Sequence, residues 1–216
     1  FGKNYLLINI PDYTIVAVKE KDTMLQQRVV VGKDTRQTPV IESKVTNINL
    51  NPNWTVPPTI LKEDLYPDAI KDKSVFAKRG LTILDAKNNE ISPWDWKIED
   101  ARKYKYVQNP GRDSSLGLMK INFPNKFSVY LHDTNHRDFF AYNYRSLSSG
   151  CVRLEKPLEM AAYLINDEEK WSLKTIQDTT DINYYNKLQQ QKEAKIAKKI
   201  AKLLAKNPLL VIPERK

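Results

Sequence analysis

The sequence predicts a mainly β fold with an α/β insert, on three observations. Short segments rich in β-branched residues, separated by turn residues, fill the first fifty positions. A stretch with four prolines and helical spacing then interrupts them, and alternating segments resume after Gly117. A chain of 216 residues can bury one substantial core and carry a small subdomain. We therefore expect a discontinuous sheet domain over 1–50 and 114–181, an insert over 51–113, and a C-terminal segment over 182–216.

The first fifty residues predict a hairpin-rich sheet. The strand-like segments are "YLLINI", "YTIVAVKE" and "QQRVVVGK", and a fourth, "SKVTNINLN", follows them. Turn residues separate these segments at Pro11-Asp12, at Lys21-Asp22 and again from Gly32 to Asp34. Strands joined in this way pair with their neighbours in the sequence.

The insert has a different character from the sheet. Helical patterns begin at "TILKEDL" and "DAIKDKSVF", a β-like piece "LTILDAKNNEI" follows, and "SPWDW" adds two tryptophans. An insert of this size with several aromatic residues fits a lid, or one wall of a binding cleft. A packed excursion with no role in the site fits the pattern equally well.

Strands resume in "LGLMKINFP" and "KFSVYLHD". In the second segment, alternation predicts that Phe127, Val129 and Leu131 share one face while Ser128, Tyr130 and His132 share the other. A loop and a short strand, "CVRLE", come next. "KPLEMAAYLIND" then has the spacing of a helix with Leu158, Ala161, Ala162 and Ile165 near one face.

Most of the positive charge lies near the C-terminus. The net charge is +9, and residues 187–206 hold seven lysines and one glutamate, which leaves about +3 (9 − 6) for the rest. A nucleic-acid binder would spread basic residues over its recognition surface, so we expect no nucleic-acid partner. Residues 183–206 predict a basic amphipathic helix, docked on its own domain or in contact with a membrane surface or a protein.

The compartment cannot be derived from the residues. A single cysteine excludes an internal disulfide, which by itself favours a reducing compartment only weakly. No apolar run approaches the roughly 20 residues that span a bilayer. Because the chain opens directly into a strand-like segment, we expect Phe1 to follow from a trimmed precursor, so a missing leader says nothing about export.

A cysteine and a histidine are the candidate chemical groups. Cys151 is the single cysteine, and a nucleophilic thiol needs a base or a nearby cation. His132 ends a predicted strand on its polar face, whereas His136 lies in a loop, where a solvated histidine is the default. We assign the base role to His132. Alternation places Cys151 and Arg153 on one face, where the guanidinium could favour a thiolate or bind a carboxylate.

Other interpretations of the cysteine remain open on spacing alone. A lone cysteine is more often a small buried hydrophobe. A zinc site is disfavoured because no close-spaced pair of ligands appears, so we expect no metal. A papain-like protease is disfavoured too, since there the cysteine precedes the histidine and lies on a helix. Gly150 could let backbone N–H groups near Cys151 point at an oxyanion.

The flanking residues carry a specific resemblance. "YLHDT", followed 19 residues after its histidine by the cysteine of "SSGCVR", resembles the active-site signature of the L,D-transpeptidases, with a YkuD-type fold. Asp133 and Ser149 depart from the commoner form, which has glycine and histidine there, and resemble the larger periplasmic YcbB-like branch. "VVVGKDTRQTPV", "NPNWTVPPTILKEDLYPDA", "SPWDW" and "LGLMKINFPNKFSVYLHDT" extend the similarity over about residues 5–171. Residues 51–113 would then be a capping subdomain.

The resemblance implies roles for the site residues. Cys151 would attack the third residue of a peptidoglycan tetrapeptide stem, releasing D-alanine, and His132 would activate the thiol. The backbone carbonyl of Asp133 would orient the imidazole. Gly150, Cys151 and Ser149 would line the oxyanion site. Tyr130 and Arg153 would border the substrate, with Trp54 a further candidate on the insert.

The resemblance also implies the partners and the location. An amine of a second stem would resolve the thioester into a 3→3 cross-link, with carbapenem-type inhibitors acylating the same thiol and no metal or organic cofactor required. Water as acceptor would give a carboxypeptidase, and a protein amine an anchoring reaction. The departures at Asp133 and Ser149 leave a non-catalytic peptidoglycan- or partner-binding module as an alternative. The resemblance implies a periplasmic, cell-envelope location.

Overall fold

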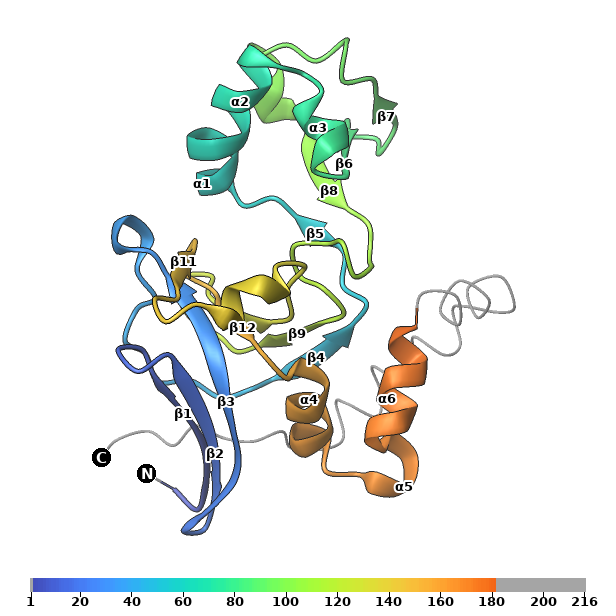
Figure 1. Ribbon diagram of the computed structural model, residues 1–216. Coiled ribbons are helices and arrows are strands. Elements are labelled where there is room, and N and C mark those ends of the chain that lie inside the picture. Colours follow the sequence, from blue (N-terminus) through green and yellow to red (C-terminus); the bar gives the residue numbers. More distant parts are fainter. Residues whose placement is uncertain (1, 182–216) are drawn as a thin grey trace.

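The computed structural model describes residues 2–181, which form a sheet domain and a smaller subdomain beyond one end of it (Figure 1). The larger sheet has the strand order β1-β2-β3-β12-β10-β9-β4, and β11 pairs with β3. Its strands are β1 (Asn4–Asn9), β2 (Thr14–Lys19), β3 (Asp22–Gly32), β4 (Asn47–Leu50), β9 (Met119–Asn122), β10 (Leu131–His132), β11 (Ser146–Ser148) and β12 (Val152–Leu154). The chain leaves this sheet after β4 and returns to it at β9.

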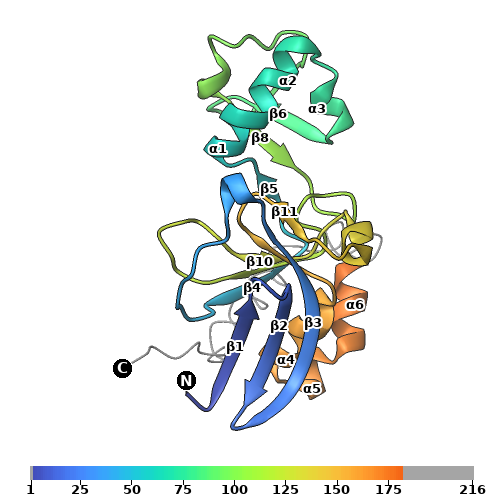
Figure 2. The ribbon, with the colours of Figure 1, turned by 60° about the vertical axis from the view of Figure 1, so that its left-hand side comes forward.

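The first three strands form an antiparallel meander, as the sequence predicts. Three helices, α4 (Pro157–Ile165), α5 (Glu168–Trp171) and α6 (Leu173–Thr180), lie along one side of this meander (Figure 2). Ile15, Val31 and Leu154 from the strands share one apolar core with Met160 and Ile176 from the helices. Burial of this core is the main stabilising contribution to the sheet domain, because apolar burial dominates folding.

The inserted subdomain has a core of its own. Its sheet has the order β5-β8-β6-β7, and its elements are β5 (Trp54–Thr55), α1 (Pro58–Ile60), the π-helical turn η2 (Leu61–Leu65), α2 (Tyr66–Lys71), α3 (Val75–Lys78), β6 (Leu81–Leu84), β7 (Glu90–Ile91), the 3₁₀ turn η3 (Ala101–Lys103) and β8 (Lys105–Gln108). Phe76 and Tyr106 stack at its centre with ring centroids 5.9 Å apart. Trp96 donates from Nε1 to the Tyr106 hydroxyl at 2.7 Å, which satisfies both buried polar groups.

The strand expected over "KFSVYLHD" is wrong for most of its length. The structure has a strand only at β10, and Phe127 is 49% exposed. Asn125 accepts from the N–H groups of Phe127 and Val129 and donates to Val129 O at 2.7 Å. Ser128 adopts a positive φ of 56°. These side-chain bonds close a turn where alternation alone predicts extended chain.

The helix α4 buries a different set of residues from the expected one. The buried stripe of α4 is formed by Pro157, Met160, Ala161, Leu164 and Ile165, whereas the predicted Leu158 and Ala162 are only partly buried.

The predicted basic helix over 183–206 lies outside the described residues. Within residues 2–181, no helix has the length and apolar character that crossing a bilayer demands.

Candidate active site

Four of the sequence-predicted residues share one face of the larger sheet. β10 and β12 run parallel, and their register pairs His132 with Arg153. The Val152 N–H donates to Tyr130 O at 3.1 Å, which places Tyr130 beside Cys151. These two residues lie two positions before His132 and Arg153 in their own segments, and so on the same face. In a parallel pair, residues in register point to the same face. The structure therefore brings Tyr130, His132, Cys151 and Arg153 together.

A tight turn presents Cys151 at the start of β12. The Ser148 hydroxyl donates to Cys151 O at 2.5 Å, and the Gly150 N–H donates to Ser148 Oγ at 3.1 Å. Gly150 has a φ of 111°, a region that other residues rarely adopt. The Thr38 hydroxyl holds Gly150 O from the other side at 2.8 Å. The Gly150 N–H, expected at the oxyanion site, is thus engaged within the turn.

The Cys151 thiol is partly buried and lies among groups that favour its ionised form. Burial raises the pKa of the thiol, while the backbone and hydroxyl of Tyr130, and the cations Lys120 and Arg153, lower it. The Sγ–H donates a weak bond to Ser128 O at 4.0 Å. In this resting arrangement the thiol is neutral, and its hydrogen bond goes to a carbonyl oxygen.

His132 is buried as a neutral imidazole. Burial, together with the charges of Arg153 and Lys120, lowers the pKa of His132 to about 3, and the backbone of Asp133 and of Ser115 opposes that shift. Neither backbone group reaches Nδ1 with hydrogen-bond geometry, since that nitrogen has no hydrogen-bond partner within residues 2–181. A neutral imidazole is the form that accepts a proton, as a general base must.

The Asp133 carboxylate has a structural role. Its Oδ2 accepts from the Leu118 N–H at 2.9 Å, and its Oδ1 accepts from Arg137 Nη1 at 3.0 Å. Gly117, at a φ of 56°, leaves room for it, because a Cβ there would lie 2.3 Å from Oδ2. The backbone of Asp133 acts to raise the pKa of His132, against the effect of burial. That its carbonyl orients the imidazole stays a prediction.

Tyr130 joins the site to the inserted subdomain. Its ring lies edge-on to His132, with centroids 5.5 Å apart. Burial raises the pKa of Tyr130, whereas Trp54 on β5 favours the ionised phenol through a polar contact. Trp54, the candidate on the insert, is therefore brought to the site through Tyr130.

Arg153 is a partly buried cation with spare hydrogen-bonding capacity. Burial lowers the pKa of its guanidinium. Nη1 donates to Thr134 Oγ1 at 3.4 Å, and the guanidinium lies 5.5 Å from the Phe139 ring centroid. Its buried Nε has no hydrogen-bond partner within the described part of the chain. Such a group is suited to binding an anion that enters the site.

Two residues at or beside the site were missed by sequence reasoning. Lys120 on β9 pairs with His132 and lies on the same face of the sheet. It is the single charged residue in the alternating segment "LGLMKINFP". Arg36 donates from Nη1 to Ser149 Oγ at 3.1 Å and binds Asp64 of η2. Alternation could have found Lys120, but nothing local marks Arg36, whose partners are 28 and 113 positions away.

His136 lies outside this cluster. Its side chain is 53% exposed, and its ring stacks on Phe139 with centroids 4.8 Å apart. Within residues 2–181, no group of histidine, cysteine and acidic side chains is arranged to hold a metal ion.

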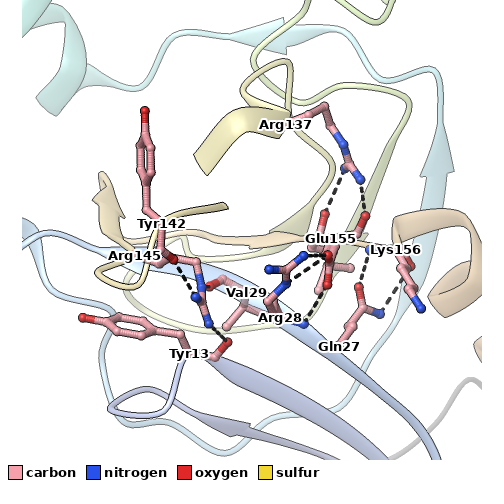
Figure 3. Close-up of polar contacts among 10 residues, drawn as sticks. Tyr13, Gln27, Arg28, Val29, Arg137, Tyr142, Arg145, Glu155 and Lys156 are labelled. Atoms are coloured by element: carbon pink, nitrogen blue, oxygen red, sulfur yellow. Dashed lines mark hydrogen bonds and ion pairs between the residues drawn. The ribbon is translucent and has the colours of Figure 1, made fainter. Parts of the chain in front are cut away.

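A polar network joins β3, the end of β12 and the loop that leads to Cys151 (Figure 3). Arg145 donates to Val29 O at 3.2 Å, to Tyr142 O at 2.7 Å and to Tyr13 O at 3.3 Å. Arg28 pairs with Glu155, and Arg137 donates to the same residue's carbonyl (Figure 3). The Arg145 bonds are buried or partly buried, and bonds of this kind hold irregular backbone in place.

Comparison with known proteins shows the family of the chain. A family model described as the L,D-transpeptidase catalytic domain, YkuD, matches residues 3–176. The chain belongs to the L,D-transpeptidase family.

A curated relative of this L,D-transpeptidase domain comes from Haemophilus influenzae and is named a putative L,D-transpeptidase. The two are 38% identical over 167 residues, which covers 76% of this chain and 34% of the relative. The domain thus spans about a third of the length of the relative it matches.

Solved L,D-transpeptidases are similar at lower identity. The Enterococcus faecium enzyme, as a C442S mutant, is 12% identical with a TM-score of 0.41, covering 76% of this chain and 45% of that one. LdtMt1, in complex with imipenem, is 12% identical with a TM-score of 0.42, covering 74% and 53%.

Proposed function

We propose that this L,D-transpeptidase domain forms 3→3 peptidoglycan cross-links through a thioester on Cys151. The observation that carries the proposal is the shared face on which the register of β10 and β12 brings His132, Tyr130 and Arg153 around the thiol. A nucleophile, a neutral base and an anion-binding cation then lie together, as acyl transfer requires.

In the first half-reaction, the neutral imidazole of His132 takes the thiol proton as Sγ attacks the carbonyl carbon of the third stem residue. The developing oxyanion needs donors, and the amide of Cys151 is available because no hydrogen bond to it is made within residues 2–181. The carbon–nitrogen bond to D-alanine breaks, and the imidazolium returns its proton to the departing amine. A thioester and a neutral imidazole remain.

In the second half-reaction, an amine on the side chain of a second stem attacks the thioester. His132 accepts the proton that the amine loses, and the thiolate leaves and recovers that proton. The product is an amide between two third residues. Water in place of the amine would give a carboxypeptidase, and a protein amine would give an anchoring reaction.

The resting site supports a mechanism in which His132 removes the thiol proton during the attack, and not one that starts from a thiolate–imidazolium pair. Burial raises the pKa of Cys151 and lowers that of His132, so thiol and imidazole are both neutral before substrate binds. The thiol must turn from Ser128 O toward His132 for proton transfer to begin. Catalytic hydrogen bonds commonly form only once substrate is bound.

Partners and location follow from the same proposal. Donor and acceptor are peptidoglycan stem peptides, and the Arg153 guanidinium, whose Nε has no hydrogen-bond partner within residues 2–181, is the group able to bind an anion of the substrate. The working place of the domain is the periplasm or cell envelope, where these stems are found. Carbapenems are expected to acylate the same thiol.

The test is the release of D-alanine from a tetrapeptide muropeptide by the purified protein. Wild type should release D-alanine and form cross-linked dimers when an acceptor stem is added, and Cys151→Ala should do neither. Muropeptide binding with no release from wild type would refute the proposal and favour a non-catalytic cell-wall-binding module instead.

A further inference from the structure

Lys120 is a cation inside the site that the two half-reactions do not use. β9 pairs it with His132, so it lies on the face that carries Cys151. Its ammonium is 3.9 Å from the centroid of the Tyr130 ring. The side chain is partly buried, and no carboxylate within residues 2–181 forms an ion pair with it. A partly desolvated ammonium with no counter-ion favours any anion that forms nearby.

The row formed by Lys120, His132 and Arg153 crosses three adjacent strands. The imidazole is therefore flanked by a cation on each side, and both cations disfavour its protonated form. The same two cations favour the thiolate of Cys151. Their charges act in one direction, toward a thiolate beside a neutral imidazole, because like charges repel and opposite charges attract.

The ring of Tyr130 holds Lys120 in place. A cation over an aromatic face is attracted by the ring's negative face, and the contact is stronger when the pair is desolvated. Tyr130 also contacts Cys151 through its backbone and hydroxyl. One side chain thus contacts both the cation and the thiol.

We propose that Lys120 assists the reaction through its charge: its ammonium, seated on the Tyr130 ring, stabilises the negative charge that Cys151 Sγ carries as its proton leaves. This rests on the proposed role of Cys151 as the nucleophile. The competing role for Lys120, binding a carboxylate of the substrate, is separated by the experiment.

The experiment measures the rate of Cys151 alkylation by iodoacetamide against pH, followed by intact mass on the full 216-residue chain. Iodoacetamide is neutral and has no carboxylate, so its rate reports the thiolate and not substrate binding. Because Cys151 is the single cysteine, the added mass has one source. The variants are Lys120→Met and Lys120→Gln, which remove the charge, and Lys120→Arg, which keeps it.

The matched control is Lys126→Met. Lys126 is exposed, and its ammonium lies 5.1 Å from the centroid of the Phe127 ring, so this change removes an exposed lysine–aromatic contact. Thermal unfolding of each variant verifies folding, and Lys120→Gln serves if Lys120→Met does not fold.

The proposal predicts that the neutral variants raise the inflection of the profile by about one pH unit, with alkylation below it slowed about tenfold. The plateau at high pH should change by less than about twofold, since the thiolate itself is intact. Lys120→Arg should stay near wild type, and Lys126→Met should match it.

Two results would overturn the proposal. An unchanged alkylation profile in the neutral variants, with D-alanine release reduced, would assign Lys120 to substrate binding. An equal shift in Lys120→Arg and Lys120→Met would show that shape, and not charge, sets the profile. Alkylation needs no stem peptide, so a failure of the transpeptidase proposal would appear separately, as absent D-alanine release.

Discussion

Arg36 and Asp64 join the sheet domain to the inserted subdomain through a two-point contact: Nη1 lies 2.6 Å from Oδ2, and Nη2 lies 2.9 Å from Oδ1. The same guanidinium pairs with Glu63 and donates to Ser149 Oγ, two residues before Cys151. The Arg36 side chain is only 11% exposed, which makes the contact less screened than a surface ion pair. The position of the insert is thereby linked to the turn that presents the nucleophile.

Replacing Arg36 with methionine should loosen the insert. The two-point contact and the bond to Ser149 would be lost together, at a cost of about 1–3 kcal/mol. Hydrogen exchange of the amides in η2 and α2 should then rise about tenfold or more. Arg79→Met is the matched control, because it removes an exposed ion pair to Asp68 within the insert, worth about 0.5 kcal/mol. Equal exchange in the two variants would contradict the link.

Replacing Gly117 with alanine should disturb the support of His132. A Cβ at this position would lie 2.3 Å from Asp133 Oδ2 and would displace that carboxylate from the Leu118 N–H. Gly80→Ala shares the positive φ (59° against 56°) but has no atom within 4 Å of the added Cβ. We expect about 1 kcal/mol of destabilisation for Gly80→Ala, and about 3 kcal/mol or more for Gly117→Ala, by urea unfolding.

D-alanine release should distinguish the same two variants. Only Gly117→Ala should lose activity at a temperature where both remain folded. If both variants lose activity equally, the close approach of Gly117 and Asp133 has no role in the site.

Acid should destabilise the fold through His132. Its pKa is about 3 in the folded chain, where burial is the largest cause, against about 6.5 in an unfolded chain. Between these values the unfolded chain binds a proton that the folded chain does not, so the free energy of unfolding falls as pH falls. The slope is at most about 1.4 kcal/mol per pH unit.

The measurement compares unfolding free energies at about pH 7 and about pH 5. Wild type should lose about 2 kcal/mol more than His132→Gln over this interval. His136→Gln is the control, and it should behave as wild type, because His136 is exposed. Parallel losses in wild type and His132→Gln would mean that His132 is not buried in its neutral form.

Sequence patterns predicted most of the sheet because its strands satisfy local rules. The meander β1 to β3 has β-branched residues between turn residues, and both rules depend only on neighbours in the chain. The strand expected around Val129 was wrong because Asn125 bonds three groups of the segment after it and closes a turn. Asn125 lies between two expected strands, and its residue type does not show how far into the next segment its side chain will bond.

The reactive residues of the site could be predicted from the sequence, but the contacts that hold them in place could not. Alternation placed Cys151 with Arg153, and strand ends placed His132 near them. Arg36 was missed because its role depends on a contact between two parts of the chain that only the fold brings together. The resting hydrogen bonds of Gly150 and Cys151 also follow from turn geometry, which residue types alone do not define.

The central claim is that Cys151 forms a covalent acyl-enzyme, and intact mass spectrometry after incubation with a carbapenem tests it most directly. The protein should gain the mass of a single inhibitor molecule, and Cys151→Ala, verified as folded by thermal unfolding, should gain none. No gain in wild type, or an equal gain in Cys151→Ala, would contradict the account.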